Sequence, residues 1–423
     1  MPVDRDWLSA QGTDASLLSS VSAAFDPNSP PSLGVAVSGG SDSMALLHLL
    51  ARIGPQAGWQ VFAVTVDHGL RPEARAEAAL VAAACAKIGV AHTVLAWHRT
   101  ATTGNLQDQA ARGRYALMTA WAKARGLATM ALGHTADDQA ETFLMQLARE
   151  AGIDGLSGMR QSWTQDGVRW TRPLLGQRRR ELRDYLDRNC ISWVDDPSND
   201  NARFDRVRVR QFMPELKRLG ITVDVLAGVA GQLASVRNAL NACCRKVADR
   251  IVIQTGGDLI FQRQALLSCE PEVRRRLLNA ALRWVSGSEY SPRRSAQFAL
   301  DQAILHAKAK TLSGCRISCT QAEIRISREL NALRSHSAAT TELWDNRWQC
   351  AGPHDPSLHI RVLGEGGLRH CPDWRLTGLP RYSLLASPAI WQGDTLIAAP
   401  LAGHGNEWSA QIVADFHTSP LSH

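Results

Sequence analysis

The chain has 423 residues, of which 45% are hydrophobic and 21% charged. This composition excludes a disordered, collagen-like or disulfide-stapled protein and suggests about two to four domains. Lysine and arginine total 47 against 40 acidic residues, and only six of the 47 are lysines. The excess makes an anionic partner plausible, but a compositional bias toward arginine would produce the same count.

Cysteine usage indicates a reducing compartment, and the apolar segments bear on targeting and on membrane association. The nine cysteines form no C-x-x-C pair, as expected for reduced and mostly buried thiols. The first residues lack the basic start and apolar run of a signal peptide, and no run of about 18 apolar residues suggests a membrane span. We therefore expect a cytoplasmic protein that does not associate with membranes.

Strand-like and helix-like segments alternate along the first part of the chain. Short apolar runs occur at 33–37, 60–66, 91–97 and 127–132, and segments with helical spacing follow at 43–52, 72–88, 106–125 and 137–149. This order predicts parallel strands joined by right-handed crossovers, which form a doubly wound α/β sheet.

The pattern changes after residue 150. A fifth strand is expected at 169–175 and a helix at 178–188, followed by helical character at 221–250 and 272–310, a β-like stretch at 311–330 and a linker at 335–341. The remainder is rich in proline, glycine and tryptophan without helical periodicity. We expect an α/β catalytic domain over 1–215, a mainly helical middle domain over 216–334 and a small β-rich C-terminal domain over 335–423.

A glycine- and serine-rich loop lies between the first predicted strand and helix. Its residues are Ser38, Gly39, Gly40, Ser41, Asp42 and Ser43. The glycines let backbone N–H groups approach an anion, the helix adds its partial positive charge, and the hydroxyls can donate to phosphate oxygens. Asp42 would repel phosphate unless it holds Mg²⁺. The spacing is neither that of a Walker loop nor that of a dinucleotide fingerprint.

Two further motifs follow predicted strands. The second strand ends in V-D-H-G-L-R-P (66–72), and the fourth ends in G-H-T-A-D-D-Q-A-E-T (133–142). Ligands bind at the carboxyl ends of such strands. Asp137 or Asp138 could cap the following helix, but a cap does not explain His134, Asp138 and Glu141 together. Asp138 and Glu141, three residues apart, share one helix face.

These motifs resemble a known family. S-G-G-x-D-S resembles the loop of the PP-loop ATP pyrophosphatase superfamily, and the two later motifs resemble those of the tRNA(Ile)-lysidine synthetases. The family's G-L-x-G-M, R-P-L-L and D-P-S-N segments are matched at 155–159, 172–175 and 196–199. The motifs span about half of the chain, over residues 34–210.

Two positions depart from the family pattern. With Arg114-Tyr115 aligned, Ala111 stands where the first arginine of A-R-x-x-R-Y falls. Val207 follows Arg206, where the family commonly has asparagine. Any contact that this asparagine makes would be missing here.

The resemblance implies a PP-loop (adenine nucleotide alpha hydrolase-like) fold and a ligase reaction. In that reaction ATP adenylates the C2 oxygen of the wobble cytidine of a CAU-anticodon tRNA(Ile), and the ε-amine of free L-lysine then displaces AMP to give lysidine. The product changes codon and charging specificity from methionine to isoleucine. ATP and Mg²⁺ are the implied cofactors, and the pattern leaves the oligomeric state open.

The residues fit the demands of this chemistry. Ser38 to Ser43 would hold the ATP phosphates, with Mg²⁺ on Asp42. By motif position, the expected catalytic residues are Asp42, Arg114, His134, Asp138 and Glu141. Asp138 and Glu141 would also bind the lysine cation and accept its proton, although the division of roles with His134 stays open. A surface helix residue is the alternative for Arg114.

Arginines cluster beyond the predicted sheet. The expected tRNA-binding residues are Arg178, Arg179, Arg203, Arg206 and Arg208, with further tRNA contacts from the two later domains. A solvated charged face is the alternative, and Arg206, Arg208 and Arg210 would share one face only in an extended segment.

Two other functions are alternatives for this sequence. A PP-loop tRNA thiolase would normally need paired cysteines for a persulfide or an Fe–S cluster, and the absence of any C-x-x-C pair counts against it. A non-enzymatic RNA-binding protein on a decayed PP-loop fold would not need the intact loop at 38–43 or the acidic pair.

Overall fold

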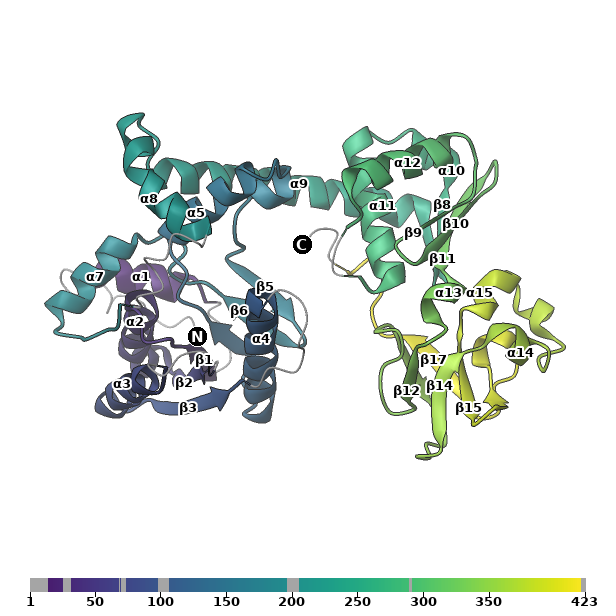
Figure 1. The fold of residues 1–423 in the computed structure, drawn as a ribbon, viewed down its shortest axis with the longest axis horizontal. Helices are drawn as coiled ribbons and strands as arrows, with labels where there is room; N and C mark the ends of the chain where they lie inside the picture. Colours follow the sequence, from purple (N-terminus) through teal and green to yellow (C-terminus); the bar gives the residue numbers. More distant parts are fainter. Residues whose placement is uncertain are drawn as a thin grey trace. The chain divides into compact units, whose positions relative to one another are not determined.

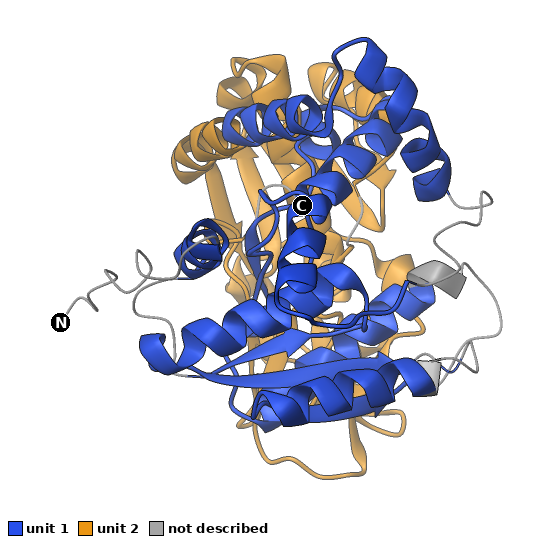
Figure 2. Ribbon diagram, turned by 90° about the vertical axis from the view of Figure 1, so that its left-hand side faces the viewer, with its two compact units in different colours: residues 1–237 blue, residues 238–423 orange. Residues whose placement is uncertain are grey.

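A computed structural model describes residues 14–25, 32–67, 69, 74–97, 106–195, 205–288 and 291–419. The chain divides into two compact units, residues 1–237 and 238–423 (Figures 1 and 2). The first unit carries every predicted catalytic residue.

The first unit is built on a six-stranded sheet in the order β3-β2-β1-β4-β6-β5. The strands are β1 (Ser32–Ala36), β2 (Gln60–Asp67), β3 (Ala91–Ala96), β4 (Thr129–Ala131), β5 (Ser162–Gln165) and β6 (Val168–Thr171). β3, β2, β1, β4 and β6 run parallel, and β5 pairs antiparallel with β6. The predicted doubly wound sheet is therefore confirmed, and its order reverses at β1, where such folds bind ligands.

Helices cover both faces of this sheet (Figure 1). They are α1 (Ala15–Ala23), α2 (Ser41–Ala57), α3 (Ala74–Lys87), α4 (Leu106–Ala124), α5 (Ala136–Leu147), α6 (Ile153–Leu156) and α7 (Arg179–Arg188). Fully buried leucines of α2, such as Leu46 and Leu50, pack with α1, α7 and β1, whereas Met118 of α4 packs with β2, β4 and β6. Gly34 of β1 makes room for this second core, because a Cβ there would lie 2.2 Å from the sulfur of Met130.

Two helices follow the sheet. α8 (Asp205–Arg218) and the start of α9 (Val223–Ile251) pack against α5, where Ala140 and Phe143 meet Val223 and Leu226. α9 continues along the chain into the second unit. The arginines after residue 204 are therefore helical, so they spread around α8 instead of sharing one extended face.

The second unit begins with a five-stranded antiparallel sheet in the order β7-β8-β11-β10-β9. Its elements are β7 (Val252–Thr255), β8 (Asp258–Gln262), α10 (Arg263–Leu267), α11 (Pro271–Ser286), α12 (Arg294–Leu305), β9 (Lys310–Leu312), β10 (Cys315–Cys319) and β11 (Glu323–Arg328). The predicted helices and the β-like stretch at 311–330 are present. The β7–β8 hairpin was not expected; Gly256 and Gly257, both at positive φ, form its turn.

The end of the second unit is rich in short strands, as predicted. Its elements are α13 (Leu330–Leu333), β12 (Ser337–Ala339), β13 (Trp348–Ala351), β14 (Leu358–Val362), α14 (Gly364–Leu368), α15 (Arg381–Leu385), β15 (Pro388–Gln392), β16 (Thr395–Ala398) and β17 (Ser409–Ile412). Trp344, Trp348 and Trp408 are buried in one core. Arg347 is buried as well, and it donates to the carbonyl oxygens of Val285 at 2.6 Å and Gly257 at 2.7 Å. These bonds tie the β-rich end to the preceding sheet and helices.

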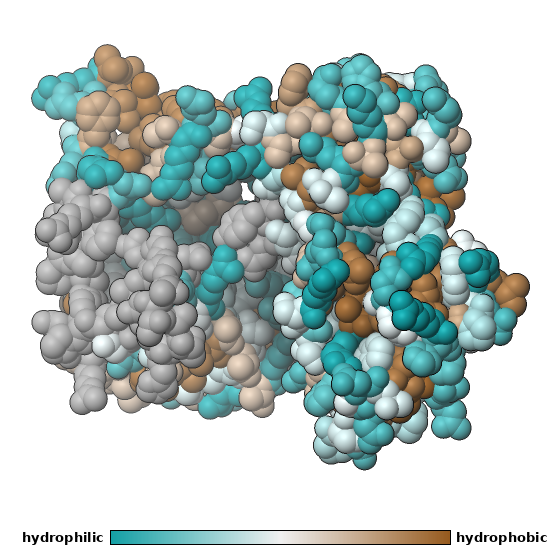
Figure 3. Space-filling view, turned by 45° about the vertical axis from the view of Figure 1, so that its right-hand side comes forward, coloured by the Kyte–Doolittle hydropathy of each residue, from teal (hydrophilic) through white to brown (hydrophobic). Residues whose placement is uncertain are grey.

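No single helix in the described ranges is long and apolar enough to cross a membrane; the bent pair α8 and α9 meets that test only when taken together. On the face drawn in Figure 3, hydrophobic residues of the second unit occur in small groups between hydrophilic ones.

Candidate active site

The predicted phosphate loop lies between β1 and α2 and is held by its own hydrogen bonds. Gly40 precedes the helix in an extended conformation, and Gly39 has a φ of +89°, a backbone conformation that favours glycine. The hydroxyl of Ser43 accepts from the Ser38 N–H at 3.1 Å and donates to the Gly40 carbonyl at 3.0 Å. Ser43 thus holds the loop over the helix N-terminus, an arrangement suited to an anion.

The segment after β4 packs directly on this loop. A Cβ on Gly133 would lie 3.0 Å from the Cα of Ser43 and 3.1 Å from the carbonyl oxygen of Asp42. Only glycine allows the two backbones to approach so closely. The fold therefore brings the polar stretch at 134–141 beside the phosphate loop.

Thr135 is the N-cap of α5, which corrects the expectation that Asp137 or Asp138 caps this helix. Asp138 is the third helical residue, and its Oδ2 accepts from the N–H of Thr135 at 2.8 Å and from its hydroxyl at 2.9 Å. This is a capping box. The box fixes the Asp138 carboxylate and leaves its Oδ1 for another partner.

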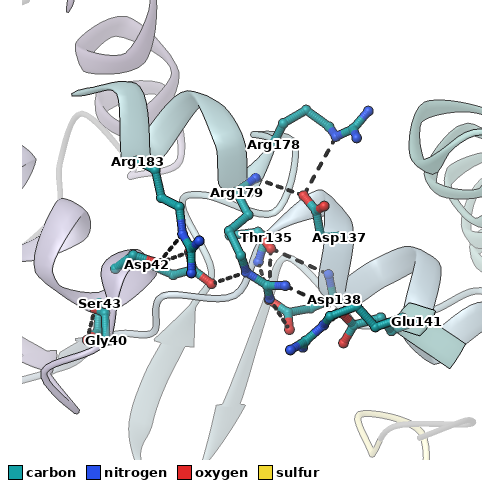
Figure 4. Close-up of polar contacts among 12 residues, drawn as sticks. Gly40, Asp42, Ser43, Thr135, Asp137, Asp138, Glu141, Arg178, Arg179 and Arg183 are labelled. Atoms are coloured by element: carbon teal, nitrogen blue, oxygen red, sulfur yellow. Dashed lines mark hydrogen bonds and ion pairs between the residues drawn. The ribbon is translucent and has the colours of Figure 1, made fainter. Parts of the chain in front are cut away.

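Arg179, the first residue of α7, joins the three predicted carboxylates (Figure 4). Its guanidinium lies 2.9 Å from Asp42 Oδ2, 3.1 Å from Asp138 Oδ1 and 3.4 Å from Glu141 Oε1. Arg210 of α8 adds a second contact to Glu141 Oε1 at 2.9 Å. Two guanidinium groups therefore face three acidic side chains.

The surroundings of Asp42 and Asp138 shift their pKa values in opposite directions. Burial raises the pKa of Asp42 above its ordinary value, even though Arg179 opposes this effect. Burial also acts on Asp138, but Arg179 and the hydrogen bonds from Thr135 hold its pKa below the ordinary value. Asp138 is consequently the more firmly ionised of the two.

Glu141 has one oxygen that is not engaged. Its side chain is only 4% exposed, and Oε2 is buried without a hydrogen-bond partner among the described residues. A buried carboxylate oxygen without a donor is costly. The oxygen is available to a donor that the protein itself does not supply.

His134 and Arg114 complete the predicted set. Nδ1 of His134 accepts from Nε of Arg172 at 3.2 Å. Burial lowers the pKa of His134 to about 4, and the nearby charges of Arg172 and Arg114 act in the same direction. Nε of Arg114 is buried and, within the described ranges, has no hydrogen-bond partner. Arg114 is thus placed near His134, in line with the predicted set.

The remaining arginines differ in their surroundings. Arg178 pairs with Asp224 at 3.0 Å, and Arg208 pairs with Asp205 and is 62% exposed. Arg206 lies on α8 close enough for its charge to lower the pKa of His134. Arg203 lies outside the described residues, as do His68 and residues 196–199.

Several contributing residues were not predicted. Arg179 was grouped with the RNA-binding arginines, and no local pattern in the sequence places it among carboxylates. Gln139 binds the loop at 155–159, because its amide donates to the Met159 carbonyl at 3.1 Å and accepts from the Met159 N–H at 2.6 Å. Arg172 was expected as part of R-P-L-L and of the arginine cluster, and not as a partner of His134.

The acidic side chains can accommodate one magnesium ion shared with phosphates. Among the described residues, no group of three or more His, Cys, Asp or Glu side chains could form a metal site of its own. Mg²⁺ bound to ATP needs only one or two carboxylates, since phosphates and waters supply the other ligands. Asp42, beside the phosphate loop and already facing a cation, fits that requirement.

Comparison with known proteins identifies similar chains. The pattern of the PP-loop domain matches residues 14–216. A tRNA(Ile)-lysidine synthase of Ruegeria pomeroyi is 44% identical over 96% of this chain and 98% of its own length. One of Anaplasma marginale is 31% identical, over 88% and 86%. Among solved structures, a U34-tRNA thiolase of Methanococcus maripaludis with a [4Fe-4S] cluster covers 56% of this chain and 80% of its own, at a TM-score of 0.45 and 14% identity.

Proposed function

The chain belongs to the tRNA(Ile)-lysidine synthase family and carries that family's PP-loop domain; from this premise we propose the details of its reaction. The enzyme is a tRNA-modifying ligase that binds ATP. Its substrates are a tRNA(Ile) with a CAU anticodon and free L-lysine, which it joins at C2 of the wobble cytidine. The likeness to lysidine synthases over almost the whole length favours this activity over that of a thiolase.

The phosphate loop at 38–43 holds the ATP phosphates. Support comes from the glycine backbone, the hydroxyls and the N-terminus of the 17-residue helix α2 at the same place. Mg²⁺, when bound at Asp42, would neutralise charge on the phosphates. Arg114, by its closeness to His134, would face the negative charge that develops as the cytidine oxygen attacks the α-phosphate.

Lysine binding is assigned to Asp138 and Glu141. The observation that carries this assignment is the buried Oε2 of Glu141, which has no partner in the described part of the chain. An ammonium group brings three donors and no acceptor. In the displacement step the amine loses a proton to one of these carboxylates. Its nitrogen then forms the bond to C2, while the C2–O bond breaks and AMP leaves with the electron pair.

The tRNA is assigned to Arg178, Arg206 and Arg208, together with Arg203 and the second unit. Arg178 and Arg208 each pair with an exposed aspartate. Phosphate groups of the tRNA could replace these aspartates as partners of the guanidinium groups. Arg179 was expected in the same set. Its contacts with three carboxylates favour a role inside the catalytic cluster instead.

The test separates ATP use from lysine transfer. Wild-type protein, ATP, radiolabelled lysine and CAU tRNA(Ile) should yield labelled tRNA, and a tRNA with a changed wobble base should not. Glu141→Gln keeps the shape but removes the charge, so we expect adenylation of the tRNA, measured by pyrophosphate release, to persist while label transfer falls by at least about 100-fold. Glu150→Gln, at an exposed position just beyond α5, is the control. Normal label transfer by Glu141→Gln would refute the lysine site.

A further inference from the structure

Arg172 is fixed by contacts that do not depend on His134. It follows β6, and its Nη1 donates to the carbonyl oxygen of Arg160 at 2.7 Å. Its guanidinium lies over the ring of Trp163, with 4.2 Å between Cζ and the ring centroid. Tyr115 forms a further side-chain hydrogen bond with it. Nε of Arg172 in turn donates to Nδ1 of His134. Because backbone and ring hold the guanidinium in place, it can dictate the state of the imidazole.

The direction of this hydrogen bond determines the tautomer of His134. An arginine side chain has five donors and no acceptor, and it stays protonated in proteins. Nδ1 of His134 must therefore carry a lone pair, which leaves the ring neutral with its single proton on Nε2. A protonated ring would oppose one N–H with another.

The other charges around His134 act mostly in the same sense. Arg172 beyond β6, Arg114 on α4 and Arg206 on α8 all disfavour a charged imidazole, as does burial. Asp138 on α5 acts in the opposite direction and is outweighed, since the pKa of His134 falls to about 4. The ring is consequently neutral throughout the physiological pH range.

We propose that Arg172 is a positioning residue that locks His134 as the Nε2–H tautomer, so that His134 serves the reaction as a hydrogen-bond donor and not as the base for lysine. The proposal rests on the proposed function and divides the roles within the site. The Nε2–H donates to a substrate oxygen that gains negative charge, whereas the lysine proton goes to a carboxylate. A neutral imidazole suits this task because it stabilises charge without exchanging a proton.

Nitrogen NMR tests the tautomer in the full-length protein without substrate. With ¹⁵N-histidine labelling, the His134 signals are assigned by their loss in His134→Gln. We expect Nε2 protonated, Nδ1 unprotonated and no titration from about pH 8 to about pH 5. Arg172→Met should bring the pKa up toward the ordinary value of about 6.5 and mix the tautomers. Arg169→Met, at an exposed position on the preceding strand β6, should change neither the pKa nor the tautomer.

Kinetics gives a second, independent readout. Glutamine can place an amide N–H near the position of Nε2, so His134→Gln should keep activity within about tenfold of wild type. His134→Ala should lose about 100-fold to 1,000-fold in kcat, the range for one oxyanion donor. A wild-type Nδ1–H, an Arg172→Met spectrum identical to wild type, or equal losses in the two His134 variants would each overturn the proposal. The NMR result stands even if lysine transfer is not observed, so failure of the proposed function is distinguishable.

Discussion

Among the described residues, replacing Arg179 with glutamine would leave Arg210 as the remaining cationic partner of the cluster Asp42, Asp138 and Glu141, through its contact with Glu141. The four groups of this cluster are buried to different degrees: the side chains of Arg179, Asp42, Asp138 and Glu141 are 19%, 17%, 11% and 4% exposed. Removing one partner of a buried ion pair costs about 3–5 kcal/mol. Because Arg210 remains and the cluster is partly hydrated, we expect the lower end, about 3 kcal/mol.

The loss should depend on pH. In the wild type the pKa of Asp138 lies below its ordinary value of 3.8, so its stabilising contribution is complete above that value and disappears only as the pH falls through the lower folded pKa. Without Arg179 the pKa of Asp138 would rise, because burial acts upward and Arg179 is the largest of the influences that hold this pKa down. The variant therefore loses the most stability at neutral pH. As the pH is lowered, Asp138 becomes protonated in the folded variant, and the difference in free energy of unfolding from the wild type becomes smaller.

Hydrogen-exchange mass spectrometry on the full chain, in increasing urea, measures this effect locally. Peptides from α5 and α7 report the free energy of opening at about pH 7.5 and about pH 5, where a tenfold change in protection equals about 1.4 kcal/mol. Arg180→Gln, next on the same helix and 90% exposed, should change stability by less than about 0.5 kcal/mol. Equal stability of the two variants, or a deficit that grows on acidification, would contradict the reasoning.

Two other substitutions test the site and the tRNA surface. Gly133→Ala should cost about 1–3 kcal/mol by overpacking and weaken ATP binding in a nucleotide titration, because its Cβ meets the backbone of the phosphate loop. Gly152→Ala, whose added Cβ has nothing within 4 Å, is the control, and equal ATP affinities would dismiss the packing argument. Changing Arg206 and Arg208 together to alanine should reduce the slope of log affinity for tRNA against log salt by about 2, and an unchanged slope would return both residues to an ordinary solvated face.

The parts of the fold that the sequence predicted are those with strong local signals. The buried strands β1 and β2 and the leucine-rich helix α2 have hydrophobic patterns that can be recognised from their own residues alone. β5 was missed because it is an edge strand whose residues are mostly exposed, so it has no apolar run. β7 and β8 were missed because they are short and the glycines of their turn resemble an ordinary loop.

In the candidate site too, features with a local sequence signal were predicted and features without one were not. The residues of the phosphate loop and of 134–141 could be identified as a candidate site because motifs at the carboxyl ends of parallel strands meet in one crevice. Their detailed partners could not be identified in this way. Thr135 and not an aspartate caps α5, and Arg179 reaches Asp42 across 137 positions of sequence.

The sequence by itself determined the family, and it predicted the phosphate loop and the chemical types of the candidate catalytic residues, because these depend on residue identity at short spacing. Only the tertiary structure decided what each arginine contacts. Arg178, Arg179 and Arg180 are consecutive, yet their surroundings differ. Arg178 contacts Asp137 and Asp224, Arg179 contacts the carboxylates of the candidate site, and Arg180 is mostly exposed to solvent. Successive residues at the start of a helix point about 100° apart. The packing of that helix against α2, and no local pattern, selects the side chain that enters the site.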